Sequence, residues 1–250
     1  MKPTVRQLVI DIGNSGSKAA IFGGDELLSP VHRFAPDDWE RIDGLATNPG
    51  VKNIIYSTVA NVPSDRWIDK WKAAGRGVYT LDRQRSLPFV SDYLSPETLG
   101  QDRIAVVAGT LGRYTTPRLV VDAGSCVTLD LVEADGRYRG GNISPGVGMR
   151  LRAMHEGTAR LPLVGIGPLK ESVGSSTETA LRHGGILGVV YEIEGLCHRL
   201  RNTYPELQIV LTGGDALLLL PHFSISVHHS PQLVLHGLNQ ILSLYVNEAL

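Results

Sequence analysis

The sequence predicts an α/β protein built from two halves of the same plan. Strand-like apolar runs alternate with helix-like runs along the chain, and one strand–turn–strand pattern occurs twice. The pattern is QLVIDIGNSGSKAAIF near the N-terminus and RLVVDAGSCVTLDLV near the middle. A repeat this widely spaced indicates two duplicated halves rather than a solenoid. We therefore predict domains over 1–115 and 116–250, divided near Tyr114–Pro117, where a proline ends the preceding helix.

In the first half, apolar runs bounded by Gly, Asn and Ser predict strands, and the first two are joined by a tight turn as in a hairpin. Segments whose apolar residues recur at helical spacing predict helices. In chain order we expect strands over 6–12, 17–23 and 26–34, a helix over 36–46, a strand over 51–59, a helix over 64–74, a strand over 77–81 and a helix over 96–111.

The second half opens with the repeated strand–turn–strand over 118–132. A helix is expected over 177–202, then a strand that ends in a Gly-Gly turn at 213–214, then a helix over 231–250. The segment 177–202 is richer in aliphatic residues than a solvated surface usually is. It predicts either a homodimer contact or core packing inside the second domain, and periodicity does not choose between them.

Composition narrows the class of protein and its partners. Apolar residues make up 42% of the chain and charged residues 20%, with a net charge of −1, so we expect a folded protein with no nucleic-acid partner. No apolar run is long enough to span a bilayer, so no membrane partner is expected. The two cysteines, Cys126 and Cys197, have neither metal-ligand nor disulfide spacing, which favours a cytoplasmic location.

The first motif that could bind a ligand or carry out chemistry is DIGNSGSK, residues 11–18. A strand ends at Asp11, and a glycine-containing turn then offers backbone N–H groups, hydroxyls and Lys18. Such a turn can cradle phosphates, the lysine can neutralise their charge, and the aspartate can hold Mg²⁺ directly or through water. The motif is neither a Walker A loop nor a Rossmann fingerprint. A plain hairpin turn is the alternative interpretation.

Two further turns strengthen the phosphate interpretation. The segment DAGSC, residues 122–126, repeats the first motif in the second half, which favours a pair of phosphate clamps. The segment LTGGDA, residues 211–216, places two glycines at the end of a strand, where a ribose or flat ring could lie on the backbone. Its alternative is a strand-to-helix turn with Asp215 as N-cap.

Two other motifs are ambiguous on their residues alone. In GQDR, residues 100–103, a carboxylate beside a guanidinium is either a surface pair or a catalytic base beside an anion receptor. In GGNISPGVGMR, residues 140–150, the glycines either serve a turn that packs closely on the next helix or border a site.

Asp122 also predicts a bound cation on charge grounds. A carboxylate at the end of a buried strand needs a positive partner, and no Lys or Arg lies between Arg118 and Arg137. A monovalent cation, with Mg²⁺ expected near Asp11, would meet that need. Alternatively Asp122 only caps the turn, or it holds a second water of the Mg²⁺ shell.

The order of these motifs resembles that of type III pantothenate kinases. The resemblance rests on DIGNSGSK, on Tyr93 followed by PETLGQDR, on DAGSC, on GGNISPGVGMR and on GSSTETALRHGGILG. It implies two actin-like (ribonuclease H-like) domains with the active site in the cleft between them. It further implies a homodimer that phosphorylates pantothenate with ATP to give 4′-phosphopantothenate, the first step of coenzyme A biosynthesis. The implied cofactors are ATP with Mg²⁺ and a monovalent cation, K⁺ or NH₄⁺.

The resemblance also implies roles for individual residues. Asp102 would be the general base, Asp122 the ligand of the monovalent cation, and Thr177 a pantothenate contact, in the same chain or across the dimer. The ATP-binding residues implied are Asp11, Ile12, Gly13, Asn14, Ser15, Gly16, Ser17, Lys18 and Ser125. The pantothenate-binding residues implied are Tyr93, Gly100, Gln101, Asp102, Arg103 and Thr177. The family often has DAGTA where this chain has DAGSC, and Ser125 keeps the hydroxyl.

Two other functions fit parts of the sequence. An actin-like kinase for another small molecule, such as a sugar, would explain the phosphate turns but leaves the GQDR segment unexplained. A nucleotide-binding regulatory protein is the alternative from another class, because relatives of the family are described as transcriptional accessory factors. The presence of Asp102 and the near-neutral net charge favour the kinase over a DNA-binding regulator.

Overall fold

The computed structural model describes residues 5–13, 16–35, 38–58, 65–169, 171 and 173–248. Contacts divide the chain into two units. Unit 1 comprises Met1–Arg113 and Gln232–Leu250, and unit 2 comprises Tyr114–Pro231. The first division lies beside the one expected from the sequence, whereas the C-terminal segment groups with unit 1 instead of with the second half.

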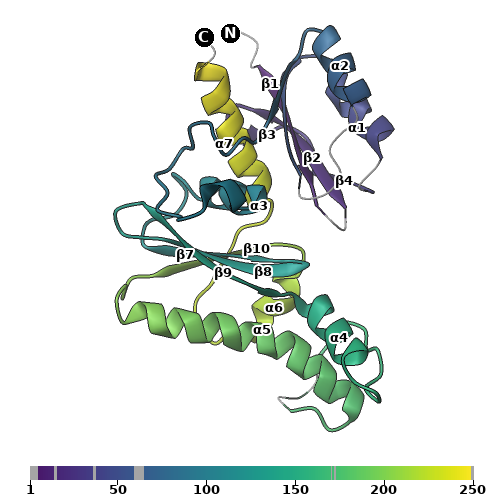
Figure 1. Ribbon diagram of the computed structural model, residues 1–250, viewed down its shortest axis with the longest axis vertical. Coiled ribbons are helices and arrows are strands. Elements are labelled where there is room, and N and C mark those ends of the chain that lie inside the picture. Colours follow the sequence, from purple (N-terminus) through teal and green to yellow (C-terminus); the bar gives the residue numbers. More distant parts are fainter. Residues whose placement is uncertain are drawn as a thin grey trace. The chain divides into compact units, whose positions relative to one another are not determined.

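Unit 1 contains a mixed sheet in the order β3-β2-β1-β5-β6, with β4 paired to β2 (Figure 1). The hairpin β1–β2 is antiparallel, and β5 and β6 continue the sheet in parallel. The strands are β1 Arg6–Ile12, β2 Ser17–Gly23, β3 Glu26–Leu27, β4 His32–Phe34, β5 Val51–Thr58 and β6 Gly77–Thr80. The third expected strand, over 26–34, is thus two short strands, β3 and β4.

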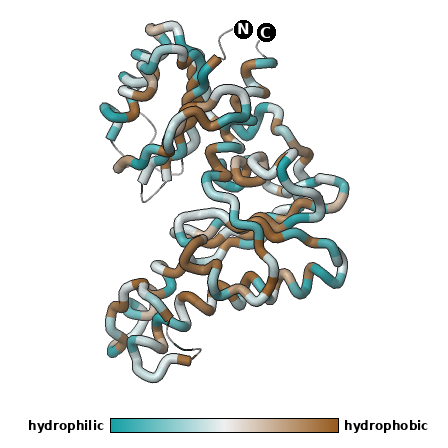
Figure 2. Tube along the Cα trace, turned by 180° about the vertical axis from the view of Figure 1, so that it is seen from behind, coloured by the Kyte–Doolittle hydropathy of each residue, from teal (hydrophilic) through white to brown (hydrophobic). Residues whose placement is uncertain are grey.

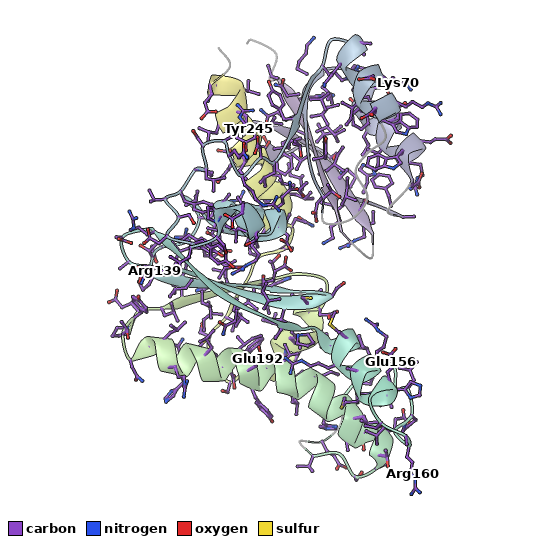
Figure 3. All side chains as sticks on the ribbon, in the orientation of Figure 1. Lys70, Arg139, Glu156, Arg160, Glu192 and Tyr245 are labelled. Carbon is purple, nitrogen blue, oxygen red and sulfur yellow. The ribbon has the colours of Figure 1, made fainter. Side chains whose placement is uncertain are left out.

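Two groups of helices complete unit 1. The helices α1 (Trp39–Ala46) and α2 (Asp65–Ala73) pack on the sheet face that carries Leu8 and Ile10, and together they bury Trp71. The helices α3 (Gln101–Ala108) and α7 (Leu233–Glu248) pack against each other, and α7 also contacts β1 and β5. Tyr245, labelled on α7 in Figure 3, is fully buried and donates to the Asp82 carbonyl at 3.0 Å.

The glycines on α3 and α7 explain why the C-terminal helix belongs to unit 1. A Cβ atom on Gly237 of α7 would lie 1.7 Å from the carbonyl oxygen of Ala105, and one on Gly109, just after α3, would lie 2.2 Å from that of Leu233. Only glycine permits this backbone-to-backbone approach. The sequence pattern showed an amphipathic helix but not its partner, and the partner is in the first half.

Unit 2 repeats the sheet of unit 1. Its order is β11-β10-β7-β8-β9, so each sheet has an antiparallel hairpin whose first strand pairs in parallel with a later strand. The strands are β7 Arg118–Ala123, β8 Cys126–Val132, β9 Tyr138–Pro145, β10 Gln208–Thr212 and β11 His228–His229. The expected duplication of one plan is therefore present in the strand order.

Helices cover one face of the second sheet. The long helix α5 (Thr177–Arg201) buries Ile186, Val189 and Ile193 against alternate residues of β7, β8 and β10, so core packing accounts for much of its apolar content. Figure 2 shows the hydrophobic segments gathered along the strands. The remaining helices are α4 Val147–Glu156, α6 Ala216–Leu219 and the 3₁₀ turn η2 Leu220–His222. No helix within the described ranges is long and apolar enough to cross a membrane.

The structure differs from the sequence expectation at the helix over 96–111. A 3₁₀ turn, η1 (Pro96–Thr98), is separated from α3 by Gly100, whose ψ of 137° is extended. The sequence analysis also did not predict β9 or α4 as elements of their own. The expected starts of helices at residues 36 and 64, the expected strand end at 59 and the last two residues lie outside the described part of the chain.

Candidate active site

Asp11 is the next-to-last residue of β1 and faces two polar side chains. It pairs in register with Lys18 on β2 and with Ser57 on β5, so all three share one sheet face. The Ser57 hydroxyl donates to Asp11 Oδ1 at 3.0 Å. Burial raises the pKa of Asp11, an effect that Lys18 and the Ser57 hydrogen bond oppose and that the negative charge of Asp102 reinforces. A cation near this carboxylate would favour its ionised form.

A backbone hydrogen bond joins the two described residues that flank the turn after β1, Gly13 and Gly16. The N–H of Gly13 donates to the carbonyl of Gly16 at 3.0 Å, and a Cβ on Gly16 would lie 3.2 Å from the Phe34 carbonyl oxygen. Glycine therefore suits this tight approach. Asn14 and Ser15, both expected to bind ATP, lie outside the described residues.

Two of the expected ATP contacts have side chains on the other face of the sheet. Ile12 and Ser17 pair with each other, and each is 1% exposed on the face that packs against α1 and α2. Because successive side chains of a strand alternate between faces, neither side chain shares the face of Asp11 and Lys18. Only the backbone of these two residues is available to a phosphate at the turn.

Gln101 fastens α3 to the sheet of unit 1. Its Oε1 accepts from the N–H of Thr58, the last residue of β5, at 2.9 Å, and its Nε2 donates to the Leu81 carbonyl at 2.8 Å. Both ends of the amide are therefore engaged by backbone groups. Gln101, which is expected to contact substrate, braces α3 against β5 next to Ser57.

Asp102 lies in the first turn of α3, where the helix dipole favours a negative charge. Its Oδ1 accepts from the N–H of Arg103 at 2.9 Å. A Cβ on Gly100 would lie 2.3 Å from that oxygen, so residue 100 must be glycine for the carboxylate to hold this position. Gln101, the residue before Asp102, is hydrogen-bonded to Thr58, and the neighbouring Ser57 donates to Asp11, so two carboxylates far apart in sequence belong to one region of unit 1.

Arg103 and Tyr93 lie together beside this site. The Arg103 side chain is buried, its guanidinium carbon lies 5.4 Å from the centre of the Tyr93 ring, and its Nη1 lies 3.5 Å from the Tyr93 hydroxyl. A cation over an aromatic face is favourable. A cavity of about 280 Å³ is lined by Gln101 together with Thr80, Leu81, Asp82, Arg83, Gln84 and Glu97.

In unit 2, Asp122 occupies the position that Asp11 has in unit 1. The residues in register with it are Thr128 on β8 and Thr212 on β10. Gly213 adopts a φ of +103°, and a Cβ there would lie 2.5 Å from Asp122 Oδ1. The Asp215 N–H donates to the Ala123 carbonyl at 2.9 Å, so the Gly-Gly turn packs directly on the acidic turn.

The GGNISPG segment packs against the same turn from its other side. The N–H of Gly146 donates to the Ser125 carbonyl at 3.1 Å, and a Cβ on Gly146 would lie 2.0 Å from the Gly124 carbonyl oxygen. Three motifs of the second half therefore meet at Ser125 and its neighbours. Sequence reasoning missed this contact, for which the glycines of the segment were the only available signal.

Thr177 lies in unit 2 at the first position of α5 and is exposed. Ser176 caps the helix by accepting from the N–H of Thr179 at 3.2 Å, and the Thr179 hydroxyl accepts from the N–H of Ser176 in return. The cap fixes the backbone while leaving the Thr177 side chain to solvent. The other residues expected to bind pantothenate belong to unit 1.

Oxygen ligands for a cation lie at both acidic turns. Among the residues that the structure describes, no group of three or more His, Cys, Asp or Glu side chains is placed to hold a metal ion. Asp11 with Ser57, and Asp122 with Thr128 and Thr212, supply oxygen ligands in small numbers. That donor set suits Mg²⁺ or a monovalent cation whose remaining ligands come from phosphates and water.

Comparison with known proteins gives consistent matches. The family model for type III pantothenate kinase matches residues 7–199. A type III pantothenate kinase of Bacteroides fragilis (strain YCH46) is 37% identical over 94% of this chain and 97% of its own length, and one of Phocaeicola vulgatus is 38% identical over the same shares.

Solved structures agree with this at the level of the fold. A Baf family transcriptional activator from Campylobacter jejuni has a TM-score of 0.60 at 22% identity, covering 96% of this chain and 99% of that one. The activator of a 2-hydroxyisocaproyl-CoA dehydratase from Clostridium difficile, with bound ADPNP, has a TM-score of 0.56 at 11% identity, covering 98% and 96%. Together with the two similar sheets, these likenesses show a two-domain actin-like fold.

Proposed function

The chain belongs to the type III pantothenate kinase family, and from that premise we propose how its residues divide the phosphorylation of pantothenate by ATP. The reaction serves coenzyme A biosynthesis and yields ADP and 4′-phosphopantothenate. In our proposal the pantothenate hydroxyl gives its proton to the Asp102 carboxylate. The pantothenate hydroxyl oxygen forms a bond to the γ-phosphorus of ATP, while the bond from that phosphorus to the bridging oxygen of ADP breaks.

The attachment of α3 to the end of β5 carries this assignment, because Gln101, next to Asp102, accepts from Thr58, next to the Ser57 that donates to Asp11. A proton acceptor for the attacking alcohol must lie near the phosphoryl group that is transferred. Asp11 is the next-to-last residue of β1, which leads into the phosphate turn, and the charge of Asp102 adds a small part to the raised pKa that burial gives Asp11. Gly100 supports the role, since any side chain there would displace the Asp102 carboxylate.

The phosphates would be held mainly by the turn of residues 11–18. Lys18 supplies the positive charge, and the backbone N–H groups of the turn supply directed donors. Asp11 would hold Mg²⁺, which usually binds proteins through one or two carboxylates and takes its other ligands from phosphates and water. The bound ion would neutralise charge on the phosphates. Asn14 and Ser15 stay in the proposal on resemblance, and Ser125 would contact a phosphate from unit 2.

Pantothenate would be bound by side chains beside Asp102. Arg103 is an anion receptor that stacks on Tyr93, a pair suited to a small carboxylate-bearing substrate. Gln101 would act indirectly, by holding α3 to the end of β5. Thr177 would add a hydroxyl from the start of α5, in the same chain or across a dimer.

Asp122 would bind the monovalent cation, K⁺ or NH₄⁺. Its register neighbours Thr128 and Thr212 are hydroxyl residues, and oxygen ligands suit such ions. In unit 1 the position equivalent to Thr128 holds Lys18, a cation built into the chain. A mobile cation beside Asp122 would serve the same electrostatic purpose.

We also propose a homodimer through the outer face of α5. Ala180, Gly184, Tyr191 and Gly195 are exposed and recur at spacings that place them on one side of the helix. Tyr191 is 61% exposed, and a Cβ on Gly184 or Gly195 would meet nothing, so a second helix could approach closely. Thr177 continues this face at the N-terminal end. Light scattering that finds only monomer at assay concentration would rule out the dimer.

A cytoplasmic location is part of the same proposal. Both cysteines are free thiols, Cys126 exposed and Cys197 buried, which suits a reducing compartment.

The deciding experiment measures ATP consumption with and without pantothenate, for wild type and Asp102→Asn. We expect pantothenate-dependent turnover in wild type and a loss of roughly 10²–10⁴-fold in the variant, the usual contribution of a general base. Circular dichroism and thermal melting control for folding. Activity within about threefold of wild type in a folded Asp102→Asn variant would exclude the base role. A rate of ATP consumption that is the same with and without pantothenate would exclude pantothenate as the substrate.

A further inference from the structure

Arg150, in the first turns of α4, connects three elements of unit 2. Its Nε donates to the Pro145 carbonyl at 2.8 Å, and its Nη2 lies 3.3 Å from Ser144 Oγ, both at the end of β9. The same Nη2 forms an ion pair with the carboxylate of Glu192, labelled on α5 in Figure 3. Only 22% of the Arg150 side chain is exposed, so it is not a freely solvated surface charge.

The segment held by this arginine lies directly on the phosphate turn of unit 2. Pro145 pairs with Cys126 across β9 and β8, and the next residue, Gly146, donates to the Ser125 carbonyl at 3.1 Å. The contact is tight, because a Cβ on Gly146 would lie 2.0 Å from the Gly124 carbonyl oxygen. Since the peptide group is planar, fixing the Ser125 carbonyl also fixes the direction of the N–H that follows it.

We propose that Arg150 is a positioning residue for ATP, which acts by holding Ser144–Gly146 against the phosphate turn at Ser125. The inference rests on the proposed contact between Ser125 and an ATP phosphate. Glu192 on α5 orients the Arg150 guanidinium through their ion pair. A loss of Arg150 leaves every atom of the phosphate turn present but less firmly oriented.

The guanidinium is suited to this task in a way that a lysine is not. Its planar fork donates from Nε to one backbone carbonyl while Nη2 serves a hydroxyl and a carboxylate. A lysine ammonium could keep the attraction to Glu192 but not this set of directed bonds. If the ion pair only fastened α4 to α5, its loss would lower stability, and any change in KM would be the same for ATP and for pantothenate.

The test compares the KM for ATP with the KM for pantothenate. In Arg150→Ala we expect the KM for ATP to rise roughly tenfold, the size of one lost charge-assisted hydrogen bond, with the KM for pantothenate little changed. Arg150→Lys and Glu192→Gln should raise the KM for ATP by less. Equal changes in the two KM values, or a lower melting temperature alone, would overturn the proposal. Should Arg150→Ala fail to fold, the two milder variants decide in the same way.

Arg182→Ala is the matched control. Arg182 is also in unit 2, is 19% exposed, pairs with Glu178 at 2.7 Å and donates to the Gly165 carbonyl at 3.2 Å. It lacks a contact with the Ser144–Gly146 segment among the hydrogen bonds of the described residues. We expect its KM for ATP to equal that of wild type, and a tenfold rise there would show that the assay reports general damage to unit 2.

Ser125→Ala separates failure of this inference from failure of the role on which it rests. If Ser125→Ala leaves the KM for ATP unchanged, the proposed phosphate contact is wrong. If Ser125→Ala raises it while Arg150→Ala does not, only the positioning role is wrong. The double variant should raise the KM by less than the product of the two single effects, because both act through one turn. A full product would show that Arg150 acts independently, which contradicts the proposal.

Discussion

The acidic turns of the two units have the same place in sheets of the same order, but the side chains facing them differ. Across the hairpin of unit 1, Asp11 faces Lys18, a cation that is part of the chain. Across the hairpin of unit 2, Asp122 faces Thr128, which carries no charge. Duplication has therefore kept the backbone plan while changing the charge balance of the site.

A second register neighbour is of the same chemical type in both units. On the parallel strand, Asp11 faces Ser57 and Asp122 faces Thr212, each with a hydroxyl beside the carboxylate. The hydroxyl donates to Asp11 at 3.0 Å. Each turn thus has a hydroxyl residue in register with its carboxylate, and the residue across the hairpin is a lysine in unit 1 and a threonine in unit 2. We infer that the negative charge of the ATP phosphates is neutralised by Lys18 in unit 1 and by a bound monovalent ion in unit 2.

Within this comparison of the two turns, the largest expected effect comes from removing Lys18. Lys18→Ala should lower kcat/KM by roughly 10²–10³-fold, as expected for the loss of one preorganised group that stabilises a transferring phosphoryl group. Thr128→Ala, at the equivalent register position, should cost less than about tenfold. Steady-state kinetics at saturating K⁺ measure both. Similar losses of kcat/KM in folded Lys18→Ala and Thr128→Ala would show that the two side chains contribute alike, which contradicts the inferred difference between the turns.

A smaller effect should appear in the response to monovalent cations. At constant ionic strength in a Tris buffer, adding KCl or NH₄Cl should raise the rate of wild type, because the bound cation neutralises negative charge of Asp122 and the phosphates. Asp122→Asn should lose this response. Thr128→Lys places a lysine where unit 1 has one, so we expect it to retain activity without K⁺.

The cation titration has two clear contrary results. If the wild-type rate is the same with and without K⁺ and NH₄⁺, Asp122 has the capping role instead. If Asp122→Asn keeps the response, the ion binds elsewhere. Melting curves of Thr128→Lys are needed as a control, since Thr128 is 8% exposed and a buried lysine is costly.

Much of the fold could be predicted because the strand signals are local. The apolar runs that end at Asp11 and Asp122 and the glycines that follow them give both the duplication and the two acidic turns. The partner of α7 could not be predicted, because an amphipathic helix does not identify the surface it covers. The fit of Gly237 against Ala105 depends on residues far apart in the chain.

The site was predicted unevenly for the same reason. The GQDR motif predicts a site at residues 100–103, but it does not indicate that Gln101 braces α3 through Thr58 and Leu81, which lie 43 and 20 residues away. Strand alternation was available from the sequence and would have separated Ser17, on the core face, from Lys18. Arg150 had no local signal, because its partners come from β9 and α5.

The smallest expected effect concerns the pH dependence of stability in the two units. Burial raises the pKa of Asp11 in unit 1 and that of Asp215 beside the acidic turn in unit 2. Each group therefore binds its proton more tightly in the folded state than in the unfolded state. Its contribution to the free energy of unfolding is fully present below the unfolded pKa of 3.8 and is lost as the pH rises through the folded pKa.

Replacing either carboxylate by an amide should therefore stabilise the ligand-free protein at neutral pH, while Asp11→Asn also loses activity. We expect Asp11→Asn to raise the melting temperature by a few degrees, since about 1 kcal/mol corresponds to roughly 2–4 °C in a chain of this size. Asp215→Asn should raise it by less, because Asp215 is less deeply buried than Asp11. Thermal melts from pH 4 to 8 test this: the gain should shrink toward pH 4, and a gain that grows as the pH falls would show that the folded pKa values lie below 3.8.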